Sequence, residues 1–175
     1  MNNNKKTFPQ NFIICGEDNK YRKILVKNII KKYKKNNYNK ILLIKIFNLN
    51  NFELNFFNNK KIFKKRVKKI RKEKFNKLKN KYKMIIIETR LQDVVREDDF
   101  LIQENSNFCL CFEGDLLGIK RAYGQLVKMK ESQLKSKTSL HIVMKIKTNE
   151  MIDSLVLRRF FRKNFDIKTI KKLKI

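Results

Sequence analysis

Runs of consecutive apolar residues, each about as long as one β-strand, constrain the fold of this 175-residue chain more than any other feature. The clearest run, residues 40–47, contains Ile41, Leu42, Leu43 and Ile44 in succession, so both faces of a strand here would be apolar. Such strands are typical of a sheet that is covered on both sides, because either face would otherwise expose apolar side chains to water. The runs predicted to be strands are residues 11–15, 40–47, 84–89, 107–113 and 139–146, with 165–170 as a last strand.

The segments between these runs carry apolar residues at helical spacing. In residues 20–35, Ile24, Leu25, Ile29 and Ile30 recur at intervals that place them on one side of a helix. Strands that alternate with helices indicate a three-layer α/β fold, in which helices flank a mostly parallel sheet. We therefore expect a single domain over residues 1–175. Helices are also predicted for residues 116–131 and 150–164, and a loop for residues 48–59.

Residues 60–83 form the most basic segment, with fourteen Lys or Arg and the single acidic residue Glu73. Phe63, Val67 and Ile70 follow a narrow helical stripe, so we predict a basic helical insertion made of one long helix or two short ones. Such a helix suits a nucleic-acid contact, an anionic membrane surface or an ordinary solvated surface. The candidate polyanion-binding residues are Lys64, Lys65, Lys68, Lys69 and Lys72.

The net charge of +28 is large for a chain of this size. It raises the local concentration of any polyanion, whether or not a polyanion is the biological partner. Drift towards A- and T-rich codons is the alternative explanation, since Lys, Asn, Ile and Phe are abundant while Ala122 is the single alanine. Drift accounts for scattered lysines better than for their concentration in one segment.

Several classes of protein are disfavoured by what the sequence lacks. Its three cysteines suggest no disulfide framework, and no spacing typical of a metal site occurs. His141 lies in an apolar run, which favours a structural histidine over a catalytic base. No apolar run is long enough for a transmembrane segment or a secretory signal. We therefore expect a cytoplasmic protein without metal or cofactor.

Three short strings resemble the MinD, ParA and FlhG group of P-loop ATPases. Residues 39–44 (NKILLI) are similar to the second strand of that family, and residues 82–89 (YKMIIIET) to its third. Residues 119–123 (IKRAY) are similar to the start of a helix in the flagellar-number regulator (FlhG-like) branch, which is the most similar one. The resemblance implies a P-loop NTPase-like fold with a phosphate-binding loop at residues 16–23.

The phosphate loop departs from the family pattern. Its glycines let backbone N–H groups surround the phosphates, whereas Glu17, Asp18 and Tyr21 bring negative charge and bulk to this place. By the resemblance, the positions of the degenerate nucleotide site are Gly16, Arg22, Lys23, Glu88 and Thr89. A lysine stands where the metal-binding hydroxyl belongs, and one carboxylate does not make a metal site. We therefore expect that the protein has no ATPase activity, uses no cofactor and is not an enzyme.

Two functions follow from these observations. The resemblance implies a non-hydrolysing MinD/FlhG-like protein that acts by binding a protein partner, in the placement or number control of flagella, of the division site or of DNA. The alternative is a basic nucleic-acid-binding protein on an α/β frame, which uses residues 60–83 as its contact. An anionic membrane surface is a further possible partner of the same segment.

Overall fold

The computed structural model describes residues 11–16, 18–35, 40–48, 50–58, 61–90, 106–113, 115–124, 127, 139–145, 159–160, 162–163 and 167–173. Residues 116–124 are helical. The other elements, in chain order, are β1 (Asn11–Gly16), α1 (Asn19–Lys35), β2 (Lys40–Asn48), β3 (Asn51–Asn58), β4 (Lys61–Val67), α2 (Lys72–Lys81), β5 (Met84–Thr89), β6 (Asn107–Glu113), β7 (Ser139–Lys145) and β8 (Ile167–Leu173). Most of the helix predicted for residues 150–164 lies outside the described residues.

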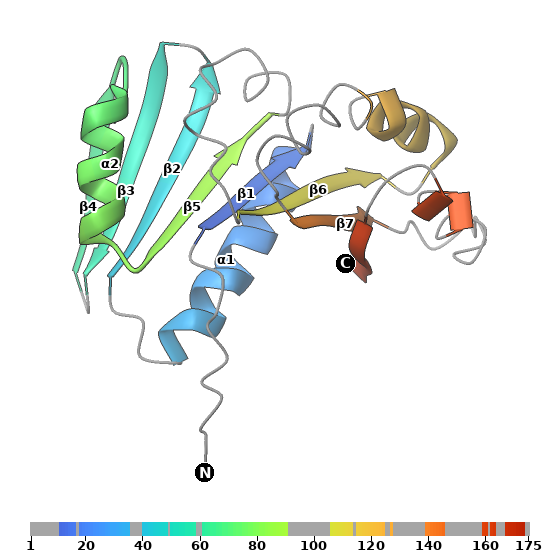
Figure 1. Ribbon diagram of the computed structural model, residues 1–175, viewed down its shortest axis with the longest axis horizontal. Coiled ribbons are helices and arrows are strands. Elements are labelled where there is room, and N and C mark those ends of the chain that lie inside the picture. The colour runs from blue at the N-terminus through green and yellow to red at the C-terminus, as the bar shows by residue number, and fades with distance from the viewer. Residues whose placement is uncertain are drawn as a thin grey trace.

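The strands form one eight-stranded sheet in the order β4-β3-β2-β5-β1-β6-β7-β8 (Figure 1). From β2 to β8 every neighbouring pair is parallel. At the other end of the sheet, β3 pairs antiparallel with both β2 and β4. The sheet is therefore mixed, and β4 is its edge strand at that end.

The predicted fold class, a three-layer and mostly parallel P-loop NTPase-like sheet with a basic helical insertion, is wrong. Residues 48–59 were expected to be a loop but form β3, and residues 60–83 were expected to be helical but form β4 followed by α2. In β3, Phe52, Leu54 and Phe56 lie on one face with polar residues between them, and this period of two belongs to a strand. In β4, lysines and an arginine occupy positions on both faces, so its sequence does not show the regular alternation of apolar and polar residues that is typical of a strand.

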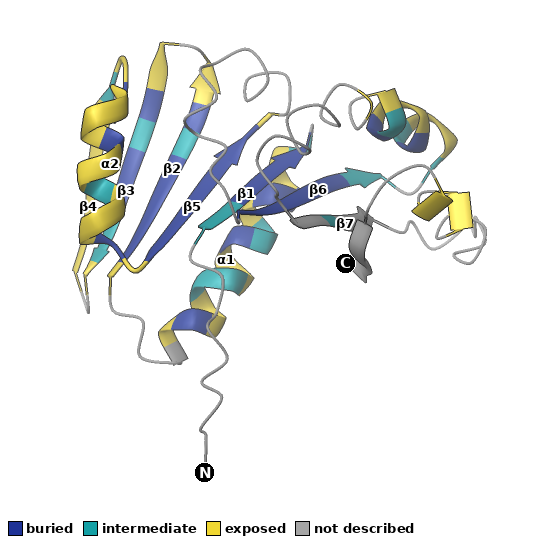
Figure 2. Ribbon diagram, viewed as in Figure 1, coloured by how far each residue is buried: buried dark blue, intermediate teal, exposed yellow. Residues whose placement is uncertain are grey.

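The apolar runs that predicted strands do contain strands, and the burial of those strands explains the runs. In β2, Leu42 and Ile44 belong to one buried cluster, whereas Ile41 and Leu43 belong to a second cluster on the opposite face. Figure 2 accordingly shows the central strands β5 and β1 as mostly buried. A strand buried on both faces needs apolar residues at every position.

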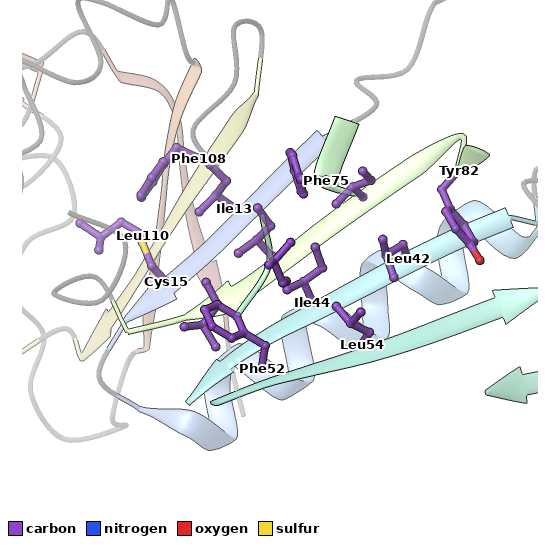
Figure 3. Packing of buried hydrophobic residues seen from close by; sticks show 14 of the residues in the cluster. Ile13, Cys15, Leu42, Ile44, Phe52, Leu54, Phe75, Tyr82, Phe108 and Leu110 are labelled. Atoms are coloured by element: carbon purple, nitrogen blue, oxygen red, sulfur yellow. The ribbon is translucent and has the colours of Figure 1, made fainter. Parts of the chain in front are cut away.

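The helices α1 and α2 cover opposite faces of the sheet (Figure 1). On one face, Val26 and Tyr33 of α1 belong to the buried cluster that contains Ile14 of β1. On the other face, Phe75 of α2 belongs to the cluster that contains Leu42 and Ile44 (Figure 3). Because α1 packs chiefly against β1 and β5, the α1 face of the hairpin formed by β3 and β4 stays open.

Candidate functional site

A groove of about 500 Å³ runs between α1 and the open face of β2, β3 and β4. Lysines form its walls: Lys23, Lys27, Lys31 and Lys34 on α1, and Lys64 on β4. Lys45 of β2 adds a sixth ammonium group. The groove therefore gathers six positive charges from α1, β2 and β4.

The α1 wall follows from the spacing of its lysines. Intervals of four, four and three residues place Lys23, Lys27, Lys31 and Lys34 on one side of the helix, over a length of about 17 Å. Like charges at this spacing repel each other when no counter-ion lies between them. A polyanion bound along this wall would relieve that repulsion.

Apolar side chains form the floor of the groove. Leu43 of β2, Phe57 of β3 and Ile62 of β4 line it, and Phe57 is directly opposite Ile62 in the strand register. The side chain of Ile62 is 56% exposed, although it is a large hydrophobic residue. The ammonium Nζ of Lys34 lies 5.3 Å from the centroid of the Phe57 ring, within the range of a cation–π contact.

A row of charged residues crosses the sheet at one end of the groove. In the register, Lys45 of β2 lies between Glu88 of β5 and Glu53 of β3, and Glu53 lies opposite Arg66 of β4. The Nζ of Lys45 is 3.1 Å from Oε1 of Glu53. A hydrogen bond from Asn55, together with the charge of Lys45, lowers the pKa of Glu53 against the opposing effect of burial.

Glu88 lies in the groove lining at this end and is 4% exposed. Its Oε1 is 3.9 Å from Nε of Arg22. Its second oxygen, Oε2, is buried and has no hydrogen-bond partner among the described residues. Burial raises the pKa of Glu88, although the nearby charges of Lys45 and Arg22 oppose this effect. The groove thus has a buried carboxyl group at its end.

The protein's own side chains occupy the turn where the resemblance predicts a degenerate phosphate loop. The carboxylate of Asp18 accepts hydrogen bonds from the backbone N–H groups of Lys20 at 2.7 Å and Tyr21 at 3.2 Å. These amides at the N-terminus of α1 are the groups that an anion would use. Arg22 is buried and donates to the carbonyl oxygen of Gly16, so it closes the turn from inside.

The helix at residues 116–124 is capped in the same way, beside a second cavity of about 300 Å³ at the ends of β1 and β6. Oδ1 of Asp115 accepts the backbone N–H of Gly118 at 2.6 Å. Asp18, Glu113 and Asp115 all line this cavity. Three carboxyl groups make it an unfavourable place for a phosphate.

The structure brings together three of the five residues predicted for the nucleotide site. Arg22 contacts both Gly16 and Glu88, but as a partner in the fold. Lys23 is exposed on the groove wall instead. Thr89 is fully buried, and its hydroxyl donates to the carbonyl oxygen of Arg90 at 3.0 Å.

The five predicted polyanion-binding lysines are exposed but do not share one surface. Lys64 lies in the groove, whereas Lys65 alternates to the opposite face of β4. Lys68 and Lys69 lie between β4 and α2, and Lys72 begins α2. The membrane-surface interpretation is disfavoured as well, because the apolar side of α2 is used in the core through Phe75 (Figure 3).

The sequence prediction missed the lysines of α1 as site residues. Their regular spacing from Lys23 to Lys34 was the available signal. This spacing did not indicate a site by itself, because the sequence did not predict β3 and β4, which contribute the opposite wall and part of the floor.

Within the residues that the structure describes, no group of three or more His, Cys, Asp or Glu could hold a metal ion. No helix in that same part of the chain is long and apolar enough to cross a membrane.

Comparison with known proteins returned no family model, no curated protein and no solved structure that matches this chain. The resemblance to MinD, ParA and FlhG, and the partner-binding function that it implies, are not tested by these comparisons. Both stay predictions. The candidate site therefore rests on the geometry and chemistry of the groove.

Proposed function

We propose that this protein binds single-stranded nucleic acid in the groove between α1 and the β2–β3–β4 face. The observation that carries the proposal is the pairing of two lysine walls with an apolar, partly aromatic floor. Lysines attract a phosphate backbone, and each phosphate contact releases counter-ions into solution. Proteins that bind single strands combine such a charged groove with side chains on which the bases stack.

The floor favours a single strand over a duplex. A duplex presents its phosphates outward and keeps the faces of its bases stacked inside, so Phe57 and Ile62 would gain nothing from it. A single strand offers those faces freely. The α1 wall extends over about 17 Å, the length of about five nucleotides at the base spacing of a stacked strand.

The shape of the groove argues against a lipid surface. Its lysines come from α1 on one side and from β2 and β4 on the other, around a hollow of about 500 Å³, whereas a bilayer presents a flat sheet of headgroups. The exposed hydrophobic residue in the groove, Ile62, belongs to a strand paired with β3 and does not belong to an amphipathic helix. Anionic vesicles serve as the competing ligand that tests this argument.

Salt-dependent binding of a fluorescent oligonucleotide tests the proposal. A groove variant carries Lys27→Glu, Lys31→Glu and Lys64→Glu. A matched control with the same net charge carries Lys65→Glu, Lys69→Glu and Lys72→Glu, outside the groove. We expect the groove variant to flatten the slope of log affinity against log salt by about two units, at about 0.7 per lost contact, and the control to change it little.

The outcomes separate the alternatives. Equal losses in the two variants would overturn the groove as a dedicated site, because they would reflect net charge alone. Tighter binding to a duplex than to a single strand of the same length would contradict the role of the floor. Binding of anionic vesicles with no binding of the oligonucleotide would replace nucleic acid with a membrane as the partner.

A further inference from the structure

We infer that Glu88 gives the groove a preference for nucleobases with an exocyclic amino group, so that cytosine binds more tightly than uracil. This inference rests on the proposed function and deepens it. The buried Oε2 of Glu88, without a hydrogen-bond partner among the described residues, is the observation that carries it. A buried acceptor left unsatisfied is costly, and a ligand that donates to it recovers that cost once a rotation of the Glu88 carboxyl group turns this oxygen towards the groove.

The charge of Glu88 decides which part of a nucleic acid reaches it. A phosphate is repelled by a carboxylate, while the sugar and phosphate groups are drawn to the lysines on the walls. The base is the part that brings N–H donors. A carboxylate that accepts from the N4 amino group of cytosine is an established mode of base recognition.

Asn55 points to the same chemistry. It lines the groove next to Leu43, and its Nδ2 donates to Oε1 of Glu53 at 3.0 Å. The Nδ2 of Asn55 has a second N–H, so its side chain still has a donor and, at Oδ1, an acceptor. Glu88 and the Oδ1 of Asn55 are thus two acceptors in the groove lining, and an exocyclic amino group has two N–H bonds to donate.

Cytosine and uracil make the sharpest pair of probes. They differ at C4, where cytosine has an amino group and uracil a carbonyl oxygen, and at the protonation of N3. We expect the wild-type protein to bind an eight-nucleotide oligo(dC) about tenfold more tightly than oligo(dU) at the same salt concentration and neutral pH, as for one hydrogen bond to a charged acceptor. Oligo(dC) with two methyl groups on each N4 lacks the donors and should bind like oligo(dU).

The variant Glu88→Gln tests whether the side chain of Glu88 causes the preference for cytosine. Glu88→Gln keeps the size of Glu88 but adds an amide N–H that donates to the O4 of uracil, so the ratio of the two affinities should fall towards one. Glu73→Gln removes the same charge from exposed α2 and should keep the wild-type ratio. The wild-type comparison of the three oligonucleotides decides the matter even where Glu88→Gln does not fold.

Failure of this inference differs from failure of the proposed function. Equal affinity of the wild type for the three oligonucleotides, with a steep salt slope, would overturn the role of Glu88 and leave the groove standing. A cytosine preference that persists in Glu88→Gln would have to come from another residue, and would overturn its assignment to Glu88. The absence of binding to any oligonucleotide would overturn the proposed function itself.

Discussion

The Nε atom of Arg22 in α1 lies 3.9 Å from Oε1 of Glu88 in β5, and both side chains are less than a tenth exposed. This ion pair lies at the junction of the turn after β1, the first turn of α1 and the end of the groove. Two buried charges of opposite sign are tolerated together, whereas either one alone is costly. The pair therefore holds the groove end in shape and keeps Glu88 in place.

Replacing Arg22 with Met should destabilise the protein strongly. The change leaves the Glu88 carboxyl buried without its cation and removes the donor to the carbonyl oxygen of Gly16. We expect a loss of about 3 kcal/mol in the free energy of unfolding, measured by urea denaturation. Arg66→Met is the control, because its ion pair with Glu53 has a similar separation of 4.0 Å but an arginine that is 81% exposed. An exposed pair contributes at most about 1 kcal/mol, so comparable losses in the two variants would contradict this account.

The raised pKa of Glu88 predicts a specific dependence of stability on pH. Between the unfolded value of 4.5 and the higher folded value, the folded state binds more protons than the unfolded state. Stability conferred by the protonated carboxyl is therefore present below pH 4.5 and is lost as the pH rises through the folded pKa.

Comparison of pH–stability curves checks this dependence. The free energy of unfolding of Glu88→Gln relative to the wild type should increase as the pH rises through that window, because the variant has no carboxyl group to ionise. The reverse trend would mean that Arg22 and Lys45 lower the pKa of Glu88 more than burial raises it. Glu53 has a lowered pKa, so Glu53→Gln should instead lose stability relative to the wild type only above its folded pKa.

The cap that Asp18 places on α1 predicts a modest stability effect and no nucleotide binding. Asp18→Ala removes the acceptor of the Lys20 and Tyr21 amides and should cost about 1 kcal/mol in the free energy of unfolding. Equilibrium dialysis with magnesium and ATP should detect no saturable binding, because the wild-type amides already have an internal acceptor. Saturable ATP binding by the wild type would contradict the structural role of Asp18.

The close packing of Gly16 against β6 predicts that this position accepts no side chain. Its φ is +154°, and an added Cβ would lie 2.1 Å from the carbonyl oxygen of Cys111. Gly16→Ala should therefore cost about 2 kcal/mol or more in the free energy of unfolding. Gly124 is the matched control, since an added Cβ there meets nothing within 4 Å and the residue is helical. Gly124→Ala should raise stability by up to about 1 kcal/mol, and a loss in both variants would show a general effect of the methyl group.

The sequence by itself determined the central strands, and it predicted that residues 16–23 form no phosphate cradle. The runs that contain Ile41 to Ile44 and Ile85 to Ile87 are apolar at every position because both faces of β2 and β5 are buried. Asp18 and Tyr21 already disfavoured a phosphate cradle by charge and size. The apolar runs and the charge and bulk at this turn can both be read within a few residues of sequence, although the burial that the runs reflect is tertiary.

Only the tertiary structure decided that β3 and β4 extend the sheet and that a groove lies beside them. The edge strand β4 is held by backbone pairing with β3, and this pairing leaves its lysines free to face solvent, so its composition resembles that of a basic helix. Lys64 lines the groove and Lys65 does not because alternate side chains of a strand point to opposite faces. Lys27 and Glu88 meet in one site across sixty residues of sequence, through the packing of α1 on the sheet. A pattern confined to neighbouring residues contains no trace of such packing.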